Sequence, residues 1–131
     1  YGLVGSEMCI RDSREGSWTV RQLVHHIADS QLQLFSRLKL ALTEENPSAP
    51  EFDQNQWVDL ADSELPIEVS IQLLEGLNKR VVAIGENVTE EQLDRQVNLV
   101  GTGELTVGFL LAKLSWHERH HLEHIKIALS Q

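Results

Sequence analysis

The chain contains very little cysteine and no long hydrophobic run. Among 131 residues Cys9 is the single cysteine, so a disulfide within the chain is impossible and a zinc finger built on thiolates is excluded. This composition is typical of a reducing compartment, and we expect a cytoplasmic protein. No apolar run approaches the roughly 20 residues that a membrane-spanning helix needs. The sequence therefore predicts a soluble protein that does not enter a membrane.

Positive charge is also scarce. Lys and Arg number 11 against 20 Asp and Glu, which gives a net charge of −9. A nucleic-acid partner is not expected, because backbone phosphates require a basic face. A nucleophilic-serine elbow, a phosphate-binding loop and a dinucleotide fingerprint are all absent from the sequence. The length fits one domain with a single core.

The first thirteen residues do not follow the pattern of the remainder. YGLVGSEMCIRDS shows no amphipathic period and no signal-peptide order. SEMCIRDS resembles a translated adapter or vector scar. We therefore expect residues 1–13 to be non-native or disordered, with Cys9 among them, and the domain to comprise residues 14–131.

Apolar residues at helical spacing predict three amphipathic helices, over about Trp18–Leu42, Pro66–Ile84 and Val107–Leu129. Thr19 is a suitable N-cap, with a glutamine three residues later that completes a capping box. Thr106 is expected to cap the last helix. Three such helices imply an antiparallel bundle, and a fourth helix would cover the apolar surface that they leave.

Two connections are informative. Thr43–Glu64 is long for a structureless segment, and its Phe52 and Trp57 indicate a lid or pocket wall. Thr89 opens a second capping-box pattern. For Gln96–Leu105 the sequence leaves both an extended and an irregular conformation open.

All the histidines fall in two short windows of predicted helix. Imidazole is the commonest metal ligand among side chains. Two clusters far apart in the sequence indicate two halves of one metal site that folding brings together. The clustered residues are His25, His26, His117, His120, His121 and His124.

Helical geometry ranks these histidines. His117 and His121 are four residues apart, so they stack on one helix face, and they point into the bundle more directly than His120 and His124. His25 and His26 diverge by about 100°; we expect His26 to lie nearer the apolar stripe. A site of His26, His117 and His121 would leave a fourth coordination position open, as in catalytic zinc sites.

Three other interpretations remain open. HERHH, from His117 to His121, matches the HExxH zincin signature with Glu118 as general base, although a third ligand and a neighbouring sheet are scarcely predicted. Glu118 and His121 also form one Glu-x-x-His pair of the di-iron type. Finally, the histidines could be structural residues of a non-catalytic metal-binding or interaction bundle.

Three segments together resemble the DinB/YfiT-like superfamily: WTVRQLVHHIADS, FDQNQW and the late W-H-x-x-H-H block. The resemblance covers about residues 14–130 and is greatest to the YfiT-type branch of bacillithiol transferase-like, metal-dependent hydrolases. It implies an all-α antiparallel DinB-like four-helix bundle. The family's first helix should precede Trp18, and we expect this chain to lack it.

The resemblance also implies a divalent metal, zinc or nickel among others, held by three histidines. Carried over by position, the ligands are His26, His117 and His121; a register shifted by three would select His120 and His124. Candidates for hydrogen-bonding to the ligands and orienting them are Asp29, His25, Glu118 and His120, and Trp57 is a candidate for the pocket rim.

The chemistry implied by the family is transfer of a low-molecular-weight thiol, such as bacillithiol, to an electrophile, or hydrolysis of a small substrate. The expected partners are therefore a small thiol and an electrophile. Apolar faces left open by a lost helix would also favour a homodimer.

Overall fold

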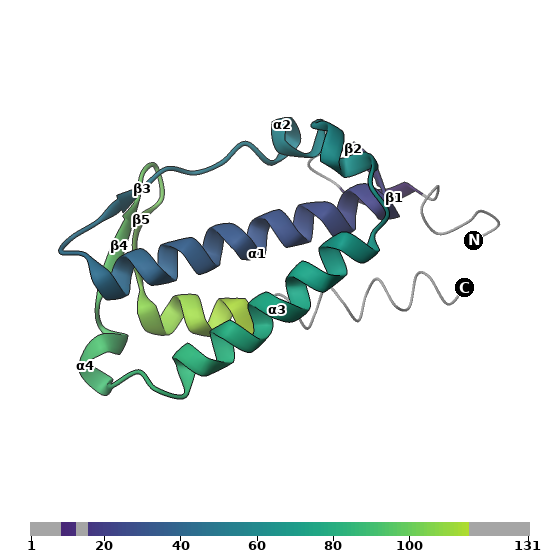
Figure 1. The fold of residues 1–131 in the computed structure, drawn as a ribbon. Helices are drawn as coiled ribbons and strands as arrows, with labels where there is room; N and C mark the ends of the chain where they lie inside the picture. The colour runs from purple at the N-terminus through teal and green to yellow at the C-terminus, as the bar shows by residue number, and fades with distance from the viewer. Residues whose placement is uncertain (1–8, 13–15, 116–131) are drawn as a thin grey trace.

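Two long helices form the frame of the molecule. The computed structural model describes residues 9–12 and 16–115, and within them α1 (Val20–Thr43) and α3 (Glu68–Gly85) pack along each other. A further helix begins at residue 107 and is described as far as residue 115. Figure 1 shows this segment, in yellow-green, between α1 and α3 at one end of the pair. The helical prediction is confirmed over this part of the chain.

The start of α1 is fixed by the capping box that the sequence predicts. The Thr19 hydroxyl accepts a hydrogen bond from the Gln22 backbone N–H at 3.1 Å, and the Gln22 side-chain oxygen accepts one from the Thr19 N–H at 2.9 Å. These bonds satisfy two backbone donors that a helix start leaves open. The helix begins at Val20 rather than at Trp18, because Trp18 belongs to a strand.

That strand, β2 (Gly16–Thr19), pairs antiparallel with β1 (Cys9–Asp12). The sequence did not predict this hairpin. Its first strand lies in the segment expected to be non-native or disordered, and the domain boundary at residue 14 stays a prediction. The non-native origin of the segment stays a prediction.

The long connection after α1 contains short elements rather than a structureless loop. It holds β3 (Ser48–Ala49), α2 (Gln54–Val58) and the 3-10 helix η2 (Ala61–Glu64). Asp53 caps α2, because its carboxylate accepts hydrogen bonds from the backbone N–H groups of Asn55 and Gln56. The connection runs along one side of α1 (Figure 1) and packs against it through α2.

A small sheet accompanies the helices, and it includes the segment Gln96–Leu105, for which the sequence left both an extended and an irregular conformation open. β4 (Gln96–Leu99) and β5 (Gly103–Thr106) form a hairpin, and β3 adds to β4 in parallel. Gly101 and Gly103 have φ values of 90° and 118°, which favour glycine in the turn. The fold stays mainly helical, with this sheet at the carboxyl end of α1.

The chain around α4 (Glu90–Leu93) is tied to the end of α1. Thr89 forms the predicted capping box of α4. Arg95 donates from Nε to the Ala41 carbonyl at 2.7 Å and from Nη2 to the Glu44 carbonyl at 2.8 Å. A cation at this position stabilises carbonyls that the helix end leaves without partners.

The last helix begins as predicted. The Thr106 hydroxyl accepts from the Phe109 backbone N–H at 3.0 Å, which is the bond expected of an N-cap. Within residues 9–12 and 16–115, no helix is long and apolar enough to cross a membrane.

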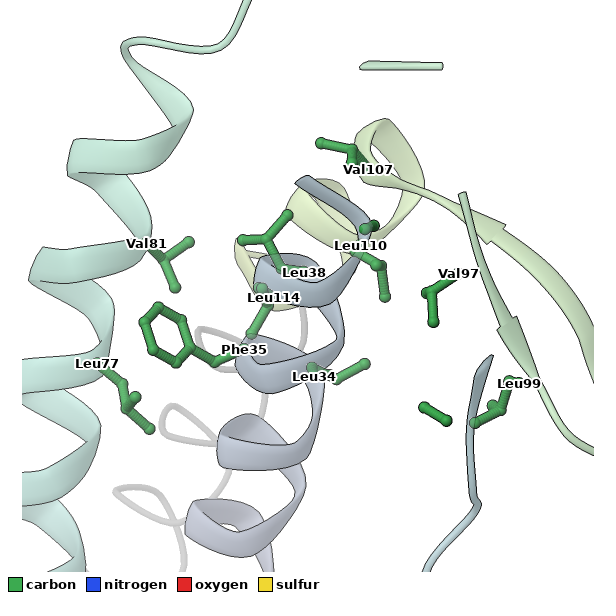
Figure 2. Close-up of a cluster of buried hydrophobic side chains, with 12 residues drawn as sticks. Leu34, Phe35, Leu38, Leu77, Val81, Val97, Leu99, Val107, Leu110 and Leu114 are labelled. Carbon is green, nitrogen blue, oxygen red and sulfur yellow. The ribbon is translucent and has the colours of Figure 1, made fainter. Parts of the chain in front are cut away.

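The main hydrophobic core lies where α1, α3, the 107–115 helix and the sheet meet (Figure 2). Leu38 is fully buried at its centre. A second cluster joins the amino-terminal half of α1 to α3 through Val20, Val24, Ile27, Ala28 and Leu74. Buried members of the main cluster are Leu34, Phe35, Leu38, Ala41, Ala49, Leu77, Val81, Val97, Leu99, Val107, Leu110 and Leu114.

Truncation of this core tests the packing. We expect Leu38→Ala to lower the free energy of unfolding by about 2–5 kcal/mol, because it removes buried methyl groups and leaves a cavity. Leu32→Ala is the matched control on the same helix: Leu32 is 39% exposed, and its truncation should cost less than about 1 kcal/mol. Urea unfolding followed by circular dichroism measures both. Equal losses for the two variants would contradict the core assignment.

Candidate metal centre

His26 is the one proposed metal ligand within the described residues. It lies in the second turn of α1, and its side chain is half-buried. Its ring centroid is 4.8 Å from a ring centroid of Trp18, with the planes tilted by 58°. The Ser30 hydroxyl lies 3.4 Å from His26 Nε2, a long and weak hydrogen bond. The imidazole is thus held between a buried tryptophan and the next turn of its own helix.

His25 has a different role. Its side chain is 5% exposed, and its Nε2 lies 2.8 Å from the Leu65 carbonyl oxygen. Because a carbonyl only accepts, Nε2 carries a proton. Nδ1 lies 2.6 Å from the Ser70 hydroxyl, which donates to it when the ring is neutral. Both ring nitrogens are therefore occupied by protein partners that join α1 to the start of α3.

The predicted facing of these two histidines is wrong. The apolar stripe was expected to bring His26 nearer the core, whereas His25 is the more buried of the two. The side of α1 that carries His25 is covered by the Leu65–Ser70 region, which supplies polar partners there. Hydrophobic periodicity locates apolar contacts and does not register a buried polar pair.

Asp29 follows these histidines by one turn of α1. Burial and the nearby Asp62 carboxylate raise the pKa of Asp29 to about 6, while His25 acts to lower it. A half-buried carboxyl group of this kind changes protonation just below neutral pH. The structure thus links Asp29 electrostatically to His25. Its role in orienting a metal ligand stays a prediction.

Gln31 joins α1 to the last helix. Its side chain is 1% exposed, and its Nε2 donates a hydrogen bond to the Leu114 carbonyl oxygen at 3.2 Å. A buried amide needs such a partner, and this one crosses from α1 to the 107–115 helix. Sequence reasoning missed Gln31, because an isolated glutamine on an apolar helix face carries no signal of its partner.

Two other polar partners were also missed. Ser30 follows His26 by four residues, so the spacing of helix neighbours would have identified it. Ser70 is distant in the sequence from His25, and the chain gives no signal that the two meet.

Trp57, the candidate for the pocket rim, belongs to α2. Its ring centroid lies 4.9 Å from that of Phe52 in an edge-on arrangement, and both side chains are half-buried. Arg37 donates to the Pro50 carbonyl oxygen at 3.1 Å and so ties this segment to α1. The connection therefore has its own packing against α1, and the rim role of Trp57 stays a prediction.

The second histidine window lies outside the described residues. This window contains the candidates His117, Glu118, His120, His121 and His124. Among residues 9–12 and 16–115, no three His, Cys, Asp or Glu side chains are grouped so that they could hold a metal ion. A three-histidine centre thus requires His26 to combine with the second window.

Comparison with known proteins identifies the family. A model of the DinB superfamily matches residues 6–125. The chain belongs to the DinB superfamily, so the prediction from the sequence motifs is confirmed.

Similar proteins support a metal-dependent activity in this family. A protein of Oceanobacillus iheyensis named "Putative metal-dependent hydrolase" is 59% identical over 117 residues, which are 89% of this chain and 68% of that protein. A protein of Halalkalibacterium halodurans with the same description is 46% identical over 116 residues, 88% of this chain and 68% of that one. The chain thus spans about two thirds of the length of these relatives.

Two solved structures from Bacillus subtilis have similar folds. YfiT, described as "a probable metal-dependent hydrolase with an unusual four-helix bundle topology", matches with a TM-score of 0.78 and 38% identity over 88% of this chain and 67% of that chain. The DinB-like protein YjoA matches with a TM-score of 0.55 and 26% identity over 97% of this chain and 74% of that chain. The predicted DinB-like bundle is confirmed.

The fold also bears on the zincin interpretation. One argument against it was that a sheet was scarcely predicted, and the structure contains a sheet whose Val97 shares a core with Val107 and Leu110 of the last helix. The expectation that a sheet would be lacking was therefore wrong. Membership of the DinB superfamily and the similarity to YfiT, which is described as a four-helix bundle, now provide the reason against the zincin interpretation.

The raised pKa of Asp29 predicts a specific pH dependence. Because the folded state binds the Asp29 proton more tightly than the unfolded chain, this group makes stability fall as pH rises from about 4 to about 6. Asp29→Asn removes the effect. Because solvent screens the charge of the partly exposed Asp29, we expect the variant to be only about 1 kcal/mol more stable than the parent at pH 7.5. This difference in the free energy of unfolding should vanish near pH 4.

Urea unfolding of both proteins at several pH values measures this difference. The control is Asp59→Asn, since Asp59 is an exposed carboxylate at the end of α2. A stability difference for Asp29→Asn that does not change with pH would contradict the assignment.

Proposed function

We propose that the protein is a divalent-metal-dependent enzyme in which His26, His117 and His121 hold the metal. It would transfer a low-molecular-weight thiol to an electrophile or hydrolyse a small substrate. The observation that carries this proposal is the hydrogen bond from Gln31 to the Leu114 carbonyl, because it sets the register between α1 and the last helix close to both histidine windows.

Axial distances from the Gln31–Leu114 contact indicate which residues of the two helices would come level with each other. Gln31 comes five residues after His26, a separation of about 7.5 Å along α1. The 107–115 helix runs antiparallel to α1 (Figure 1). In a regular helix, the third and seventh residues after Leu114 would lie about 4.5 and 10.5 Å farther along the helix axis than Leu114 does. Because the two helices are antiparallel, this direction leads toward the amino-terminal end of α1. His117 and His121 hold these positions in the sequence, so their levels would lie on either side of that of His26.

Rotation about the helix axis also favours this pair over the alternative register. Leu114 is 2% exposed and faces the core. In a regular helix, positions three, four and seven residues later lie on the same face, whereas positions six and ten residues later are rotated away by about 80–120°. His117 and His121 belong to the first group, and His120 and His124 belong to the second.

The residues described around His26 fit the role of a ligand support. Trp18 and Ser30 restrict the ring, and a restricted imidazole is better oriented for a metal. His25 does not compete as a ligand, because Ser70 and Leu65 occupy both of its nitrogens. A divalent cation held by three neutral imidazoles would supply a Lewis acid that favours deprotonation of a water or a thiol.

The two reactions need different events at the substrate. In thiol transfer, the thiol gives up its proton to solvent, the sulfur forms a bond to the electrophilic carbon, and the leaving group departs with its electron pair. In hydrolysis, a water oxygen takes the place of the sulfur. The descriptions of the relatives name hydrolysis. Zinc or nickel and a thiol such as bacillithiol belong to this proposal.

Metal content tests the ligand set directly. We expect about one equivalent of zinc or nickel in untagged protein by elemental analysis, and at least about tenfold weaker metal binding in His26→Ala, since three imidazoles are the minimum set of a catalytic site. His121→Ala should behave in the same way. His124→Ala is the matched control and should retain the metal. Loss of metal in His124→Ala with retention in His121→Ala would establish the other register.

Turnover separates the enzyme from a bundle that only binds metal. Protein loaded with metal should conjugate a small thiol to a haloarene or cleave a small ester, and a chelator should abolish this activity. Bound metal with no turnover across thiol and hydrolysis panels would contradict the enzyme assignment. Cleavage of peptides that is lost in Glu118→Gln, with metal retained, would instead support the zincin interpretation.

A further inference from the structure

Two cations from different helices meet at one aromatic ring. Lys39 Nζ of α1 lies 5.2 Å from the Phe35 ring centroid, and the Arg80 guanidinium carbon of α3 lies 4.9 Å from it. Figure 2 shows the Phe35 ring extending from α1 toward α3, near Leu77 and Val81. The ring is 6% exposed, while both cationic side chains are exposed. The two positive groups are therefore gathered at the seam between α1 and α3.

These charges have no acidic partner in the part of the chain that the structure describes. Neither Lys39 nor Arg80 forms an ion pair there. The sequence also places no Asp or Glu three or four residues before or after either one, so helix neighbours do not neutralise them. In a chain of net charge −9, two cations brought together without a carboxylate form a local positive field that an anion would stabilise.

The surface beside them is hollowed. A cavity of about 330 Å³ is lined by Phe35, Ser36, Lys39, Leu40, Thr43 and Arg80. The Thr43 hydroxyl donates to the Lys39 carbonyl oxygen at 2.7 Å, so the donors toward the cavity come from Lys39, Arg80 and Ser36. Such a volume is at the lower end of small-molecule sites and exceeds what a bare oxyanion needs.

We propose that this cavity binds the phosphate group of a small phosphorylated ligand. Arg presents a planar set of N–H donors to phosphate oxygens, and Lys adds a compact charge. Two cations match the charge of a phosphate monoester better than they match the charge of a single carboxylate. Leu40 and Phe35 also line the cavity and give the remainder of the ligand an apolar surface.

This phosphate site is separate from the proposed metal centre. Phe35 follows His26 by nine residues on α1, about 13.5 Å along the helix axis. The inference therefore does not rest on the proposed function, and it would stand if His26 bound no metal.

The experiment is a titration of the full chain with inorganic phosphate at constant ionic strength, followed by amide chemical shifts. We expect saturable shifts at Ser36, Lys39, Thr43 and Arg80. Arg80→Gln should raise the dissociation constant for phosphate at least about tenfold, because a charge-assisted hydrogen bond is lost. Arg80→Lys keeps the charge and loses the planar set of donors, so it should weaken phosphate binding by less than Arg80→Gln does.

The matched control is Lys79→Gln, which removes the same charge from an exposed neighbour on α3. It should change the dissociation constant less than about twofold. Equal weakening by Lys79→Gln and Arg80→Gln would overturn the proposal, because the binding would then follow net charge alone. Acetate binding as tightly as phosphate would overturn the assignment to phosphate. The amide spectrum of each variant shows whether it is folded.

Discussion

The structure depends on burial of one face of α1. Leu34, Phe35 and Leu38 contact the other helices and the sheet from this face, and Val24 and Ile27 extend it toward the amino-terminal end. Burial of apolar side chains is the main favourable term in folding. Because α1 carries His26 on one side and the Lys39–Phe35 contact farther along, the packing of this helix positions both of the sites proposed here.

Apolar burial alone does not fix how far one helix slides along another, and polar contacts supply this register. The His25 ring is bonded to Ser70 and to the Leu65 carbonyl, which joins α1 to the start of α3. Gln31 is bonded to the Leu114 carbonyl, which joins α1 to the last helix. A displaced helix would leave these buried groups without partners at a cost of about 1–3 kcal/mol each.

Much of the fold could be predicted from the sequence. Helical periodicity and the caps at Thr19, Thr89 and Thr106 are local signals, because each bond joins residues three apart. The β3–β4–β5 sheet was missed for a physical reason. Its strands have four residues or fewer, and β3 pairs with a strand nearly fifty residues later, so no local pattern marks them.

The candidate site, like the fold, was predicted from the sequence only in part. The sequence by itself determined the family, the helical class and the two histidine windows, because these follow from motifs and spacing along the chain. Only the tertiary structure decided that His25 is engaged by Ser70 and Leu65 while His26 lies against Trp18. It alone brought Lys39 to Arg80 across Phe35. Adjacent histidines on a helix look alike in a sequence, and the elements that pack on each side of the helix make them different.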